Sequence, residues 1–182
     1  MKRISKIAAV FFLTVLSVSG IFSEEIPNGY GNIKLGMGLE ETKEALKKNG
    51  EFGYHGDRDV SLLPGENRVL IETDAEKGFG GNFLTRCWFQ FYKEKLYIIT
   101  INVNKEKMDY YSIFTTLCKK YGEPVMLNPS KAVWKSDEIT MSLEKPLSLK
   151  YVDNKVFEEL QNKSTVPEGP TQMTREMFLE GL

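Results

Sequence analysis

Two β-forming segments joined by only two residues place the strongest constraint on how this chain folds. Residues 84–92 and 95–103 are rich in β-branched and aromatic side chains, and only Lys93 and Glu94 separate them. So short a link predicts a tight antiparallel hairpin. Because side chains alternate along a strand, one face is expected to carry Cys87, Phe89, Phe91, Tyr97, Ile99, Ile101 and Val103. The other face is expected to carry Arg86, Trp88, Gln90 and Tyr92.

Other segments have the same β-forming character and are separated by turn residues such as Pro64–Gly65 and Gly78–Gly81. Further strands are therefore expected over residues 32–35, 60–63, 68–73, 132–135, 139–144 and 147–152.

Two segments have helical periodicity instead. In residues 39–48 the apolar side is formed by Leu39, Thr42, Ala45 and Leu46. In residues 110–121 the stripe is Tyr110, Ile113, Phe114, Leu117, Cys118 and Tyr121, with Asp109 as N-cap and a stop at Gly122–Pro124. A short third helix over 156–161 is expected after Asp153 or Asn154.

The order of these elements predicts an α+β fold, in which two or three helices pack on one face of an antiparallel sheet. A helix followed by strands occurs twice, so two related halves are a reasonable expectation. Residues 24–163 are expected to form a single domain. The tail, 164–182, begins with Pro167, Gly169 and Pro170 and is expected to be flexible or to form a short helix.

The first 23 residues have the pattern of a secretory signal peptide. Three basic residues lie among the first six, an apolar run follows from Ile7 to Val18, and small residues lead to Glu24–Glu25. Cleavage is expected after Ser23, with Gly20 as the alternative, and an uncleaved anchor is the alternative to cleavage. We therefore expect a secreted or periplasmic protein with no transmembrane segment after cleavage.

Charge argues against some classes of partner. The full chain has 24 Lys+Arg and 25 Asp+Glu, a net charge of −1. Loss of the three N-terminal basic residues would make the remainder more acidic. Nucleic acid is not expected as a partner, because its recognition relies on an excess of positive charge.

The residues that usually perform chemistry are scarce. His55 is the only histidine, which rules out the zinc sites that need two imidazoles from one chain. It lies in the segment Tyr54–Asp59, where His55, Asp57 and Asp59 alternate and have the residue types to converge on a cation, although a solvated polar loop is the favoured interpretation. No metal, no cofactor and no catalytic residues are predicted.

Cys87 and Cys118 are the only cysteines. In an oxidising compartment they form a candidate disulfide. Each also lies on the apolar side of its own element, so two buried thiols are the alternative.

The segment from Ile33 to Leu46, with Gly36-Met37-Gly38 before a helix, resembles the strand–helix opening of BamE/SmpA-like and β-lactamase-inhibitor-like envelope proteins. The segment from Tyr110 to Pro124, followed by a strand with Trp134, is similar to that of many bacterial periplasmic proteins. The resemblance implies a helix-on-sheet binding or assembly module of the bacterial envelope.

Aromatic residues make up 12% of the chain and supply the best candidates for binding. If helices leave the second face of the hairpin open, Trp88, Tyr92 and Arg86 form an amphipathic surface suited to a partner. If both faces of the sheet are covered, the aromatic rings belong to the core instead. The leading hypothesis is a non-catalytic exported protein that binds another envelope component through this face. A small-ligand or glycan binder that uses Trp88 with Tyr54 and His55 is the alternative, and an enzyme of unrecognised type is less favoured.

Overall fold

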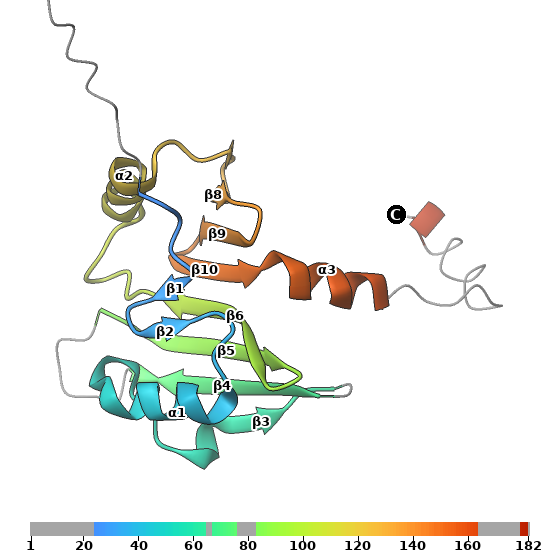
Figure 1. The fold of residues 1–182 in the computed structure, drawn as a ribbon. Helices are drawn as coiled ribbons and strands as arrows, with labels where there is room; N and C mark the ends of the chain where they lie inside the picture. Colours follow the sequence, from blue (N-terminus) through green and yellow to red (C-terminus); the bar gives the residue numbers. More distant parts are fainter. Residues whose placement is uncertain (1–23, 65–66, 76–82, 164–178, 182) are drawn as a thin grey trace, which may run out of the picture.

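The computed structural model describes residues 24–64, 67–75, 83–163 and 179–181. Its centre is an eight-stranded antiparallel sheet in the order β3-β4-β5-β6-β10-β9-β8-β7 (Figure 1). The strands are β3 (Val60–Leu62), β4 (Arg68–Asp74), β5 (Arg86–Tyr92), β6 (Lys95–Asn102), β7 (Met126–Leu127), β8 (Lys131–Lys135), β9 (Ile139–Glu144) and β10 (Ser148–Asp153). The predicted α+β class is confirmed.

Helix and strands follow one another in the same order twice. α1 (Leu39–Lys48) precedes β3 to β6, and α2 (Tyr110–Tyr121) precedes β7 to β10. The two sets of four strands meet where β6 pairs with β10, with Ile99 opposite Tyr151. The two halves that the order of elements predicted are therefore the two halves of the sheet.

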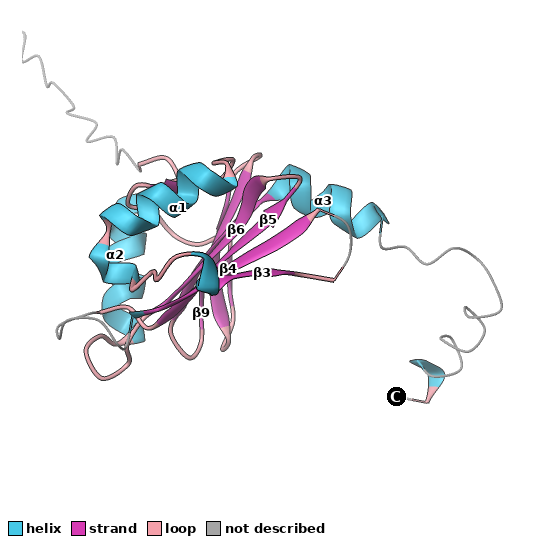
Figure 2. Ribbon diagram, turned by 90° about the horizontal axis from the view of Figure 1, so that it is seen from below, coloured by secondary structure: helices cyan, strands magenta, loops and turns pink. Residues whose placement is uncertain are grey.

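The helices α1 and α2 lie on the same side of the sheet (Figure 2). Their predicted apolar residues pack against one core, which includes Phe89 of β5, Ile99 of β6 and Trp134 of β8. Asp109 caps α2 as predicted, since its Oδ1 accepts a hydrogen bond from the backbone N–H of Ser112 at 2.9 Å. Within the described residues, every helix is too short or too polar to cross a membrane.

Several short elements were not predicted. These are β1 (Gly29–Tyr30), which forms a hairpin with the predicted strand β2 (Ile33–Lys34) before α1, and two 3₁₀ turns, Gly50–Phe52 and Asp57–Asp59, after α1. The predicted turn at Gly78–Gly81 and most of the predicted tail, residues 164–178 and 182, lie outside the described residues.

The third helix, α3 (Asn154–Lys163), packs on the opposite face of the sheet from the other two. Its Val156 and Leu160 contact Tyr92, Tyr97 and Ile98, which form a second apolar cluster separate from the main core. The helix begins where Asp153 Oδ1 accepts a hydrogen bond from the N–H of Val156 at 3.0 Å. Two helices thus share one face, and the third partly covers the other.

A β-bulge in the central hairpin corrects one sequence expectation. Gln90 pairs with Ile98, but the next residue, Phe91, pairs with Leu96, so Tyr97 has no partner across the ladder. Because Tyr97 is an extra residue in β6, the side chains of Lys95 and Leu96 before it point to the opposite faces of the sheet from those expected. Leu96 therefore enters the main core, and Tyr97, which was expected beside Phe89, packs under α3 instead.

Candidate functional site

The sheet face opposite α1 and α2, here called the open face, presents an ordered row of side chains. The row follows from the strand register, because residues paired across adjacent strands point to the same side. It runs from Glu72 of β4 through Trp88, Thr100, Lys150 and Ser142 to Val133 of β8. Glu72, Trp88, Thr100 and Lys150 are partly exposed, so this part of the face is accessible to a partner.

Trp88 is surrounded by polar groups on this face. Arg86, two residues earlier on the same strand, extends its guanidinium to Glu72, with Nε 3.2 Å from Oε1. Both side chains are substantially exposed, at 57% and 41%, so this ion pair adds little stability. Its charges remain available to a partner.

A second row of polar residues adjoins the first. The Asn102 side chain donates to the backbone carbonyl of Arg86 and accepts from the hydroxyl of Ser148. Ser142 in the first row donates to Glu144 Oε1 at 2.9 Å. The Asn102 hydrogen bonds link β5, β6 and β10 beside Trp88, whereas the Ser142 hydrogen bond lies three strands away on β9.

Tyr92 does not belong to this accessible surface. It is only 8% exposed, because α3 and the β5–β6 turn cover it. Lys163 donates to its hydroxyl at 2.9 Å, and Lys163 and Lys93 lie 5.5 and 5.1 Å from the ring centroid. The sequence expectation that Tyr92 and Trp88 form one exposed patch is therefore wrong, since α3 covers one end of the face and leaves the other uncovered.

Glu159 links α3 to the β5–β6 turn through an exposed ion pair. Its Oε1 accepts from Lys163 at 2.7 Å and from Lys93 at 2.9 Å. Hydrogen bonds to these two lysines lower the pKa of Glu159 to about 2. The carboxylate is thus charged at any physiological pH.

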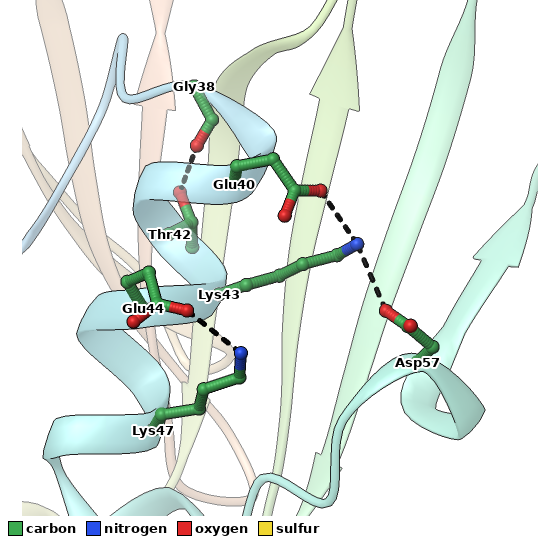
Figure 3. Close-up of polar contacts among 7 residues, drawn as sticks. All are labelled: Gly38, Glu40, Thr42, Lys43, Glu44, Lys47 and Asp57. Atoms are coloured by element: carbon green, nitrogen blue, oxygen red, sulfur yellow. Dashed lines mark hydrogen bonds and ion pairs between the residues drawn. The ribbon is translucent and has the colours of Figure 1, made fainter.

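The Tyr54–Asp59 segment lies on the α1 side of the molecule, away from Trp88. The Tyr54 ring packs against the main core, and burial raises its pKa. Figure 3 shows how α1 holds the segment: Lys43 Nζ lies 2.8 Å from Glu40 Oε1 and 3.1 Å from Asp57 Oδ1. These hydrogen bonds raise the pKa of Lys43. Trp88 and this segment do not form one joint site.

His55 and its neighbours do not converge on a cation. Asp59 Oδ2 accepts the backbone N–H of His55 at 2.7 Å and lies 3.4 Å from its ring Nδ1. Asp57 turns away to Lys43. Within the described ranges, no group of three His, Cys, Asp or Glu side chains is arranged to hold a metal ion.

Cys87 and Cys118 are free thiols, so the disulfide expected as one alternative is absent. Cys87 lies on β5, whereas α2 packs over β8 and β9, where Phe114 contacts Trp134 and Tyr110 donates to the Leu143 carbonyl. The thiols are thus separated by several strands of about 4.8 Å spacing, and a bridge requires Cα atoms within about 7 Å.

Both thiols are expected to remain reduced and Cys87 to be unreactive in the folded protein. Burial raises the pKa of Cys87 to about 11, so its thiolate fraction at neutral pH is about 100-fold below that of a free thiol. In the Cys118→Ser variant, Ellman's reagent should react rapidly with the Cys87 thiol only after the protein has been denatured. No reductant should be needed for that reaction. An intact mass lower by two hydrogen atoms in the native chain would contradict this expectation.

Two open grooves lie elsewhere on the surface, and neither is lined by Trp88. The larger, of about 980 Å³, lies between the first described residues and the β8–β9 turn. The smaller, of about 440 Å³, lies beside the start of α3. Sequence reasoning missed both, because each depends on how distant segments pack and no local pattern marks it.

Comparison with known proteins identifies the family of the chain. No curated protein sequence and no solved structure matches it. The TP0088 domain model matches residues 28–163, which include every element from β1 to α3. The chain therefore belongs to the TP0088 domain family.

Proposed function

We propose that this protein is exported to the bacterial envelope, where it binds another envelope protein through the open face around Trp88, without catalysing a reaction. The observation that carries the proposal is the half-covered sheet face. α3 covers Tyr92 and Tyr97 at one end, while Trp88 remains partly exposed among polar side chains at the other.

Export is supported by the N-terminal sequence. A basic start, a short apolar run and small residues before Glu24 are typical of a secretory signal. The resemblance of residues 33–46 and 110–124 to BamE/SmpA-like modules supports the same compartment and a role in binding.

A protein partner is supported by the composition of the face. Interfaces are enriched in Trp and Arg, and an aromatic anchor is commonly surrounded by polar groups. Trp88 with Arg86, Glu72 and Lys150 has this character, and the opposite charges around the ring suit a partner with paired charges of its own. Small ligands instead favour pockets that enclose most of their surface, and neither groove includes Trp88.

Glycan binding is the second candidate. It is favoured by one specific arrangement, the Trp88 ring flanked by a carboxylate on Glu72, a guanidinium on Arg86 and an amide on Asn102. Tyr54 and His55 do not contribute to it, because they lie on the α1 side.

The proposal is tested by crosslinking in the protein's own cells, with a photoreactive aromatic residue incorporated at position 88 of the chain. We expect one dominant crosslinked envelope protein, and we expect Arg86→Glu to weaken its formation. Position 111 is the matched control, because Tyr111 is an exposed aromatic, 72% accessible, on α2. Crosslinks to polysaccharide alone would establish the glycan alternative, and equal crosslinking from both positions would contradict a specific face.

Trp88→Ala should separate binding from folding. Since the ring is half-buried, we expect a loss of about 1–2 kcal/mol in the free energy of unfolding, well below the 3–5 kcal/mol of a fully buried aromatic. Affinity for the crosslinked partner should fall by about 30-fold or more, as for an interface anchor. Urea denaturation and titration of the purified partner measure the two effects, and unchanged affinity would contradict the proposal.

A further inference from the structure

We propose that export removes residues 1–23 and that the α-ammonium group created on Glu24 caps the C-terminal end of α2. The inference rests on the export part of the proposed function and adds a structural role for the new N-terminus. It concerns the larger groove, which lies apart from the open face.

The geometry places the nitrogen of Glu24 against α2. The backbone nitrogen of Glu24 donates to the carbonyl of Lys120, in the last turn of the helix, at 2.8 Å. Two other carbonyls at this end have different donors: that of Cys118 accepts from the N–H of Gly122, and that of Gly122 accepts from the indole of Trp134. Glu24 therefore supplies a hydrogen bond that the end of the helix otherwise lacks.

The cleavage that creates the ammonium is a hydrolysis by an export-linked protease. Water attacks the Ser23 carbonyl carbon and the bond to the Glu24 nitrogen breaks. Ser23 leaves with a carboxylate, and Glu24 keeps an amine that takes a proton at neutral pH, since an α-amino group has a pKa of about 7.7–8.0. No oxidation or reduction takes place.

The surroundings favour a positive charge at this nitrogen. The C-terminal end of a helix carries a partial negative charge, which stabilises a cation nearby. The groove is lined by carboxylates from two segments, Glu24 and Glu25 on one side and Asp137 and Glu138 on the other, with Tyr121 between them. The last turn of α2 itself carries two cations, Lys119 and Lys120, whose side chains are exposed.

The pH dependence has a definite sign. The ammonium gains a partner on folding, so its folded pKa rises above the unfolded value. The stabilisation is complete below about pH 7.7 and is lost as the pH rises through the folded pKa. An acetylated nitrogen keeps the hydrogen bond to Lys120 and loses only the charge.

The first measurement is the intact mass of the protein isolated from its own cells. The expected chain begins at Glu24. A chain that begins at Ile21, or that retains residues 1–23, would overturn the inference.

The second measurement tests the cap itself. The isolated protein is acetylated at about pH 6.5, where the α-amine reacts before the lysines because its pKa is lower. We expect its Tm at pH 6.5 to fall by about 2–4 °C and the difference from the unmodified protein to vanish near pH 10. An unchanged Tm at pH 6.5 would overturn the cap.

A matched variant controls for acetylation as such. One alanine inserted between Ser23 and Glu24 displaces the ammonium by one residue, and acetylation should then change Tm much less. An equal loss in both proteins would overturn the inference. Crosslinking from position 88 tests partner binding separately. A result that contradicts the cap therefore leaves the proposed binding face unaffected.

Discussion

Replacing Trp134 with alanine is expected to lower the free energy of unfolding by about 3–5 kcal/mol. Its side chain is only 2% exposed, and its ring centroid lies 6.2 Å from that of Phe114 on α2. The indole Nε1 also donates to the carbonyl of Gly122, directly after α2, at 2.8 Å. The substitution therefore empties part of the core and releases the end of the helix.

Trp134→Phe separates these two effects. It keeps an aromatic ring in the core but leaves the Gly122 carbonyl without its donor, so a smaller loss of about 1–3 kcal/mol is expected. Urea denaturation followed by circular dichroism measures both variants. Tyr111→Ala, at a residue that is 72% exposed, should change stability by less than about 0.5 kcal/mol. A loss below about 1 kcal/mol in Trp134→Ala would contradict the assigned role.

Gly53→Ala is expected to be the other strongly destabilising change. Gly53 has a φ of 61°, in the left-handed region, and an added Cβ would lie 2.4 Å from the carbonyl oxygen of Asp74. Backbone cannot move aside as a flexible side chain can, so we expect a loss of at least about 3 kcal/mol.

Gly31→Ala is the matched control for Gly53. Its φ is 57°, and an added Cβ meets nothing within 4 Å. The backbone cost of about 1–2 kcal/mol is shared by both variants, so the difference in their urea midpoints reports the clash. Equal losses would show that the approach of Gly53 to Asp74 is not rigid.

The helices and long strands were predictable because each carries its own periodic signal. The stripe from Tyr110 to Tyr121 faces the main core as expected. Short elements such as β1 and β7, of two residues each, carry no such signal, because two residues cannot display a period.

The sequence expectations that were wrong at the candidate site concern features that depend on tertiary structure. The bulge at Gln90 and Phe91 changes which face Tyr97 occupies, and no local residue marks it. Tyr92 was expected to be accessible, but α3 packs over it, and only the folded arrangement reveals which face a terminal helix chooses. Arg86 and Trp88 were correctly assigned to one face because the extra residue of the bulge lies in β6, and β5 pairs regularly with β4 along its whole length.

The ends of the sheet have a consequence for how partners dock. The outermost strands, β3 and β7, have three and two residues, and such short margins offer an invading strand few main-chain hydrogen bonds. Proteins commonly shorten their border strands in this way to prevent strand-to-strand aggregation. Extension of the sheet by a strand from another chain is therefore disfavoured at both margins.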